Sequence, residues 1–205
     1  MTDRSRWLLL CGAVAAGQMV LVSVLDGATR PGYDPVRNWV SQLALGPRGW
    51  LGAVNLALCG VWLILFAVGL HLHLPGGAVA VRLVALCGLG FGLIAAVPID
   101  PGLDFPPGEP AVHTALGFVH QAGAIALFAG GTMASAVLGR RVGRSRAGAA
   151  VATLMIVSFV AAAVLVTLDV NGVLAGTPSG LLERVALYAG LAWIGAAGLI
   201  LYHGR

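Results

Sequence analysis

Six long apolar segments constrain the fold of this chain more than any other feature. They cover roughly residues 7–25, 50–72, 78–98, 113–138, 147–168 and 181–202. A helix needs about 20 apolar residues to cross the hydrocarbon core of a bilayer. Each segment is expected to be a helix, because an open strand would leave backbone groups unpaired in lipid. The sequence therefore predicts an all-α integral membrane protein, a six-helix transmembrane bundle forming one domain over residues 1–205.

The charged residues support this class and predict an orientation. Only 10% of the residues are charged, whereas soluble domains have roughly 25%. With a cytoplasmic N-terminus, eight arginines would face inward and four outward. The inner set is Arg4, Arg6, Arg82, Arg140, Arg141, Arg144, Arg146 and Arg205, and the outer set is Arg30, Arg37, Arg48 and Arg184. The positive-inside rule then places both termini in the cytoplasm.

The basic loop over residues 139–146 is interpreted as a topology anchor beside anionic headgroups. Four arginines in one short loop are ordinary for a membrane protein, so no nucleic-acid partner is expected. Membrane lipids are the expected partners, together with a possible hydrophobic small-molecule ligand. The sequence leaves the oligomeric state open.

The segment GYDPVRNWVSQLALG, residues 32–46, is a polar island between the first two apolar segments. Asp34 is suited to the N-cap of a helix, Pro35 to its first position and Gly46 to its C-terminal stop. These signals predict a short amphipathic helix over residues 35–45.

Two interpretations of this short helix remain open. It lies at the membrane interface with its polar face in water, or it folds into the mouth of the bundle. In the second case Asn38 and Ser41 would face a pocket, with Arg37 beside them.

A second polar cluster follows the third apolar segment and contains Asp100, His113 and His120. The two histidines are seven residues apart, about 10.5 Å along a helix axis, which is too far for both to bind one metal ion. An ionisable side chain as deep as His120 suggests a functional site. The alternative is a neutral histidine that forms a hydrogen bond inside the bundle.

A third cluster, Asp169, Glu183 and Arg184, is expected at the same membrane level, where Asn55 could join it. Glu183 suits the N-terminus of the last helix because of the helix dipole. Arg184 could form an ion pair with Asp100 or Asp169 across the bundle.

The order of these motifs resembles that of the bacterial multi-pass membrane proteins of domain-of-unknown-function family 998. The resemblance is carried by YDPVRNWVSQLALG, Asn55, Pro98–Asp100, His113, His120, the GLLER start of the last apolar segment and Trp193. It implies a six-helix bundle in a bacterial cytoplasmic membrane, and no substrate. A weaker similarity to alkaline ceramidases involves Ser41, Asp100, His113 and His120. The chain lacks the close histidine pair that such enzymes have on the last helix, so neither a metal nor another cofactor is expected.

Three functions are compatible with these features. The first is to hold a lipid or other amphiphile in an outward-facing polar pocket, or to serve the cell envelope, with ligand-binding candidates Arg37, Asn38, Asn55, His113, Glu183 and Arg184. The second is lipid hydrolysis at the outer leaflet, with catalytic candidates Ser41, Asp100 and His120. The third is a small transporter, although no inverted repeat is evident. Whether the protein is an enzyme stays open.

Overall fold

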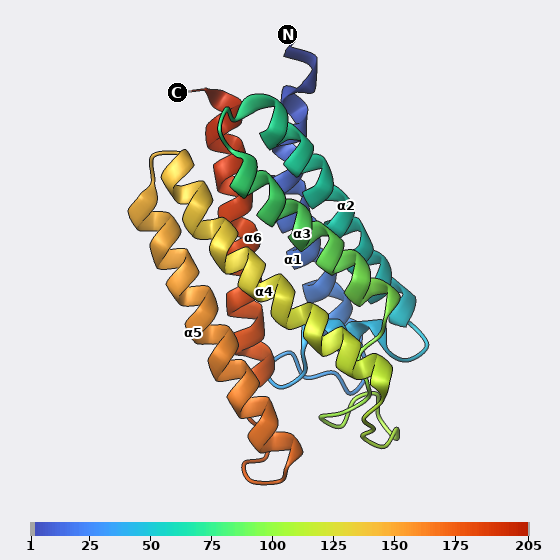
Figure 1. Ribbon diagram of the computed structural model, residues 1–205. Helices are drawn as coiled ribbons and strands as arrows, with labels where there is room; N and C mark the ends of the chain where they lie inside the picture. The colour runs from blue at the N-terminus through green and yellow to red at the C-terminus, as the bar shows by residue number, and fades with distance from the viewer. Residues whose placement is uncertain (1–2, 205) are drawn as a thin grey trace.

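The computed structural model describes residues 3–204 and contains six α-helices (Figure 1). They are α1 (Cys11–Thr29), α2 (Gly49–His73), α3 (Ala78–Ala96), α4 (Ala115–Arg141), α5 (Ser145–Val170) and α6 (Ser179–His203). A 3₁₀ helix η1 (Asp3–Leu10) runs into α1, and a second, η2 (Val40–Ala44), lies between α1 and α2. All six α-helices are long and apolar enough to cross a membrane. Residues 3–204 contain no β-strand, so the predicted all-α bundle is confirmed.

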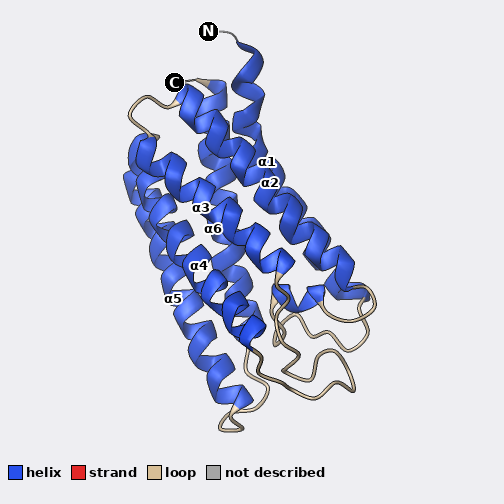
Figure 2. Cartoon of the chain, turned by 45° about the vertical axis from the view of Figure 1, so that its right-hand side comes forward, coloured by secondary structure: helices blue, strands red, loops and turns tan. Residues whose placement is uncertain are grey.

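The helices form a closed ring. Each packs against the next one in the chain, α6 returns to α1, and α4 also touches α6 across the bundle. The described ends of the chain lie at one end of the bundle, as Figures 1 and 2 show. The loops over residues 30–48, 97–114 and 171–178 lie at the other end, which we call the long-loop end.

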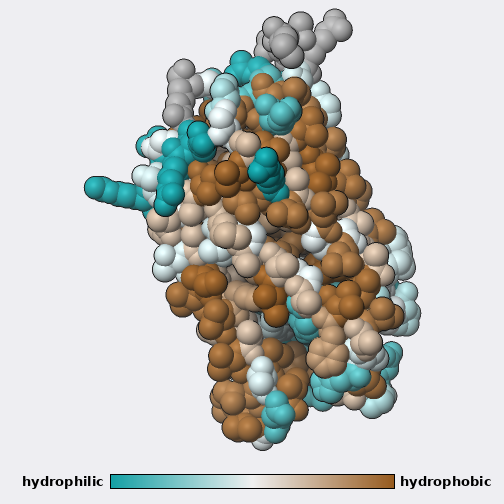
Figure 3. All heavy atoms as spheres, in the orientation of Figure 1, coloured by the Kyte–Doolittle hydropathy of each residue, from teal (hydrophilic) through white to brown (hydrophobic). Residues whose placement is uncertain are grey.

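The outer surface of the bundle is apolar, as a lipid solvent requires. Leu89 and Phe118 expose 64% and 69% of their surface. Figure 3 shows hydrophobic residues over most of this face and hydrophilic ones gathered toward the two ends. The interior contains fully buried apolar side chains such as Leu63 and Phe66.

Helices α4 and α5 approach closely at one end and separate at the other. Only residues 142–144 join them, and a Cβ atom added to Gly139 would lie 2.7 Å from the Cα atom of Gly148. Small residues permit such close backbone contact between membrane helices. From this contact the two helices diverge toward the long-loop end (Figure 1).

Candidate functional site

The polar segment folds over the long-loop end, but not as the predicted helix over residues 35–45. The backbone makes a turn at Asp34, whose carboxylate accepts a hydrogen bond from the amide of Val36 at 2.8 Å. Trp39 is extended, and only Val40–Ala44 is helical, as the 3₁₀ helix η2. The buried side chains of Asn38, Ser41 and Gln42 agree with the interpretation that places this segment in the mouth of the bundle.

The N-terminus of α6 explains why the longer helix does not form. The carbonyl oxygens of Val36 and Arg37 accept hydrogen bonds from the amides of Leu181 and Gly180, at 2.9 and 3.1 Å. A helix over 35–45 would use these carbonyls internally. Helix α6 has no side-chain N-cap of its own, so the segment supplies the acceptors that its first amides need.

Arg184 fixes the same segment from inside the bundle. It is buried, and its guanidinium donates to the carbonyl oxygens of Pro35, Asn38 and Gly180 at 2.7–2.9 Å and to the hydroxyl of Tyr33. Its hydrogen-bond partners are therefore not the expected Asp100 or Asp169. Burial of the Tyr33 hydroxyl raises the pKa of that group above its usual value. Arg184 therefore has a structural role, since it holds the polar segment against α6.

Arg37 takes the ion-pair role that was expected of Arg184. Its Nε and Nη2 atoms donate to both carboxylate oxygens of Asp169, at 3.1 and 2.7 Å. A third nitrogen pairs with the exposed carboxylate of Asp104. The hydrogen bonds with Asp169 raise the pKa of the Arg37 guanidinium above its ordinary value. The segment is thereby tied to the end of α5.

An ion-pair cluster around the buried pair Asp26–Arg30 was not predicted from the sequence. The carboxylate of Asp26, at the end of α1, accepts hydrogen bonds from Arg30 at 2.6 Å and Arg48 at 2.8 Å. Arg30 also donates to the carbonyl oxygens of Leu43, Leu45 and Arg48. The i,i+4 spacing of Asp26 and Arg30 was the available signal.

The predicted amides Asn38 and Asn55, and the neighbouring Gln42, also have structural partners. The side chain of Asn38 donates to the carbonyl of Leu103 at 3.0 Å, and that of Gln42 donates to the carbonyl of Gly102 at 2.6 Å. Asn55 accepts a hydrogen bond from Gln18 at 2.6 Å, which joins α2 to α1. Two long loops and the helix ends therefore form one tightly bonded cap.

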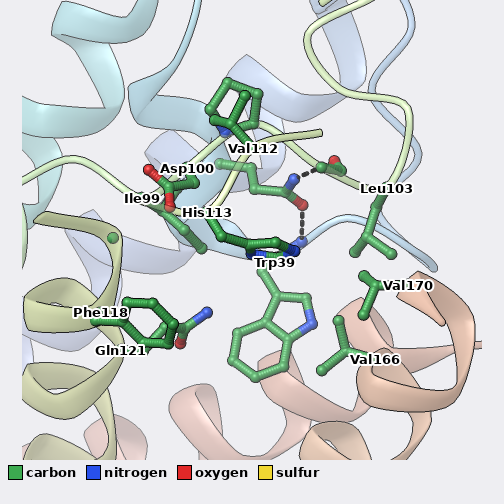
Figure 4. A pocket seen from close by; sticks show the side chains of 14 residues that line it. Trp39, Ile99, Asp100, Leu103, Val112, His113, Phe118, Gln121, Val166 and Val170 are labelled. Carbon is green, nitrogen blue, oxygen red and sulfur yellow. Dashed lines mark hydrogen bonds between the residues drawn. The ribbon is translucent and has the colours of Figure 1, made fainter. Parts of the chain in front are cut away.

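A cavity of about 120 Å³ lies under this cap, between the diverging ends of α4 and α5. We call it the mouth cavity. Figure 4 shows Phe118 and Gln121 of α4 facing Val166 and Val170 of α5 across Trp39. Gln42 of η2 and Gly117 of α4 also line it. The other lining residues come from the loop over residues 97–114, namely Ile99, Asp100, Pro101, Gly102, Leu103, Val112 and His113.

Asp100 and His113, both predicted as site residues, meet in the mouth cavity. The two carboxylate oxygens of Asp100 accept hydrogen bonds from the amide and hydroxyl of Thr114, at 2.6 and 2.7 Å. Thr114 in turn caps α4 by accepting from the amide of Gly117. Asp100 therefore positions the start of α4 and also faces the cavity, while His113 is exposed at its rim.

His120, Ser41 and Glu183 line a second, smaller cavity of about 20 Å³, which we call the inner cavity. The Nδ1 atom of His120 bonds to the carbonyl of Val97 at 2.6 Å, whereas its buried Nε2 atom has no partner. An Oε2 atom of Glu183 accepts from the amide of Val40 at 3.1 Å. Such a volume suffices for about one water-sized group.

A third cavity, of about 30 Å³ and almost wholly apolar, lies farther from the cap among Cys87, Met155 and Gly190. Trp39 and Gln121 line both the mouth and the inner cavity, and Phe128 and Leu187 are among the residues that line both the inner and the third. The three cavities therefore follow one another from the long-loop end into the bundle.

The structure thus separates the predicted site residues into two sets. Those that line cavities are Ser41, Asp100, His113, His120 and Glu183, and those that fasten the cap or the helices are Arg37, Asn38, Asn55 and Arg184. Within residues 3–204, no three histidine, cysteine, aspartate or glutamate side chains are grouped so that they could hold a metal ion. Trp39, Gln42 and Gln121 also line the cavities but were not predicted as site residues. The available signal for Gln121 was its place directly after His120 within an apolar segment.

A family described as Protein of unknown function (DUF998) matches residues 13–200, which is nearly the whole chain. No curated protein and no solved structure matches the chain.

Proposed function

Since this chain belongs to the DUF998 family, whose description carries no activity, we propose a function from the site itself: the protein binds a lipid or another amphiphile in the mouth cavity. The observation that carries this proposal is the position of the cavity between two membrane helices. Phe118 and Val170 line it and are also 69% and 49% exposed on the apolar surface of the bundle. A ligand could therefore enter sideways from the bilayer.

The chemistry of the walls fits a molecule with one apolar and one polar part. Val166, Val170 and Phe118 supply apolar contact on the helix side, and Asp100, His113 and Gln42 supply polar groups on the loop side (Figure 4). Binding sites for small molecules commonly combine apolar walls with a few placed polar groups. The bonded cap holds the polar wall in place, which lowers the entropy cost of binding.

We further propose that the site faces outward from the bacterial cytoplasmic membrane. The distribution of arginines supports this orientation, since the end opposite the cap carries Arg140, Arg141, Arg144 and Arg146. A bound ligand would then come from the outer leaflet.

Hydrolysis of a lipid is a second proposal. It is favoured by the presence of Ser41 and His120 on one cavity. In the residues described, however, Asp100 bonds to Thr114 and lines the neighbouring cavity, and the Nδ1 atom of His120 bonds to the carbonyl of Val97, so a carbonyl group rather than an acid would orient this histidine. Loss of lipid turnover in Ser41→Ala, with ligand binding retained, would support this alternative.

Photolabelling tests the binding proposal. Protein in phosphatidylcholine nanodiscs is exposed to alkyl probes that carry a diazirine in the chain, and labelled peptides are identified by mass spectrometry. We expect labels on α4 and α5 near the mouth cavity. Val166→Trp should remove most of this labelling because the indole fills the cavity, whereas Val164→Trp, two residues away on α5 and 53% exposed, should not. Equal labelling of the two variants would refute the proposal.

A further inference from the structure

The arginines at the long-loop end do not reach the cavities. Among the residues described, no arginine lines any of the three cavities, and the chain contains no lysine. Arg37 is committed to Asp169 and Asp104, Arg30 and Arg48 to Asp26, and Arg184 to backbone carbonyls. A negatively charged headgroup would therefore find neither an arginine nor a lysine among the lining side chains, and the basic groups there are the imidazoles of His113 and His120.

The acidic side chains of the lining accept hydrogen bonds when they are ionised. Asp100 lines the mouth cavity and Glu183 the inner one, so each of these two cavities holds a carboxyl group. An anion placed beside them would be repelled by any ionised carboxylate and would remain uncompensated in a medium of low dielectric constant.

The unpartnered nitrogen of His120 is an independent observation of the same kind. The carbonyl of Val97 can only accept, so Nδ1 donates to it and carries the hydrogen of the neutral imidazole. The Nε2 atom then has a lone pair and no hydrogen. His120 is 1% exposed and lines the inner cavity, where Nε2 has no hydrogen-bond partner in the protein. A buried acceptor without a donor is costly, and a ligand that supplies one removes the cost.

From these observations we infer that the site selects amphiphiles whose headgroup donates hydrogen bonds and is neutral or cationic, such as a primary alkylamine or an alkanol, over anionic amphiphiles. This inference rests on the proposed function. The headgroup donates to Asp100 in the mouth cavity, and a further donor of about the size of a water molecule reaches His120 and Glu183 in the inner one.

Three probes with the same diazirine-bearing chain test the inference: a primary amine, an alcohol and a sulfonate. Each is titrated against the nanodisc-embedded protein, and labelling at the mouth cavity is compared. We expect the amine and the alcohol to label at least tenfold more efficiently than the sulfonate. Labelling by the sulfonate at equal efficiency would overturn the inference and leave the proposed function intact. Labelling by none of the three would refute the proposed function itself.

Two variants locate the selectivity. Glu183→Gln keeps an acceptor for the amide of Val40, and Asp100→Asn keeps one for Thr114, while each removes a carboxylate from a cavity. We expect at least one of them to reduce the preference for the amine over the sulfonate about tenfold. Glu109→Gln, an exposed loop position outside the cavities, is the matched control and should not change it. Unchanged preference in both cavity variants, with unfolding temperatures like that of the control, would contradict the inference.

Discussion

At the scale of single residues, arginines hold the backbone of the cap. A guanidinium group offers five N–H donors in a fixed plane, whereas an ammonium group is a compact point charge. The Nη1 atom of Arg184 bonds to three carbonyl oxygens while Nη2 bonds to the hydroxyl of Tyr33, and the Nη1 and Nη2 atoms of Arg30 bond to three carbonyls and to Asp26. Because these donors satisfy backbone acceptors of the cap, they stabilise irregular chain at the end of a membrane bundle.

The buried carboxylate of Asp26 leads to the first prediction. Asp26→Asn leaves the side chain of Arg30, which is 5% exposed, without its counterion. Removing one partner of a buried pair costs about 3–5 kcal/mol, so the unfolding temperature in detergent should fall clearly. Asp104→Asn is the control, because its carboxylate is 85% exposed and surface ion pairs contribute only about 0–1 kcal/mol. An equal loss in both variants would show that burial is not the reason.

The second prediction concerns Gly180, which lies close to the backbone of the cap. A Cβ atom at this position would overlap the carbonyl group of Asn38, so Gly180→Ala must push the segment away from α6. Such overpacking costs about 1–3 kcal/mol, and thermal unfolding should detect it. Gly17→Ala meets nothing within 4 Å inside α1 and should stabilise the protein by up to about 1 kcal/mol through helix propensity. A stable Gly180→Ala protein would contradict the packing described.

At the scale of elements, the middle of the segment over residues 33–48, residues 38–43, is buried in the bundle and is not an exposed connecting loop. Its backbone bonds to the start of α6, and its side chains bond to the loop over residues 97–114. Gly52 of α2 also allows η2 to pack directly against that helix, since a Cβ atom there would overlap the backbone of Leu43. The element that closes the mouth cavity is therefore itself held from several sides.

Hydrogen exchange tests this description of the cap. The amides of Val40, Gln42 and Leu45 are hydrogen-bonded in a buried segment, so exchange over residues 38–45 should be slow. Residues 171–176, all exposed at the α5–α6 turn, are the internal comparison and should exchange faster. Comparable rates in the two segments would mean that the cap opens readily in the absence of ligand.

At the scale of the whole molecule, six crossings place both termini on one side and all three long loops on the other. The mouth cavity lies at the long-loop end, between α4 and α5, which are in close contact at Gly139 and Gly148 toward the opposite end. The bundle is thus tight at the end of the termini and open where the polar side chains gather.

The orientation in the membrane can be tested by cysteine labelling. Glu109→Cys lies in an exposed part of the cap, and Arg144→Cys lies in the exposed turn between α4 and α5. The native cysteines, Cys11, Cys59 and Cys87, are buried and should label little. An impermeant maleimide added to intact cells should label the first position and not the second. The reverse result would place the termini outside the cytoplasm.

Much of the candidate site could be recognised from the sequence, but not the role of each residue. Asp100, His113 and His120 were identified because ionisable groups are rare in a lipid-facing chain, and each lies at a cavity. Arg37 and Arg184 were identified for the same reason, but their hydrogen bonds hold the cap in place. A charged residue in an apolar chain is expected to have a partner. The sequence does not identify that partner, because Arg37 and Arg184 bond to residues more than 100 positions away in the chain.

The apolar pattern of the sequence is enough to predict the number and type of the membrane helices, because a long apolar stretch can satisfy its backbone in lipid only within itself. The tertiary structure alone decided the conformation of the segment over residues 33–48. Local signals at Asp34, Pro35 and Gly46 favour a helix there, but the amides at the start of α6 and the guanidinium of Arg184 take up its carbonyl oxygens. Unsatisfied groups buried at a helix end cost more than a short helix gains, so the distant partners prevail and the cavity forms beneath them.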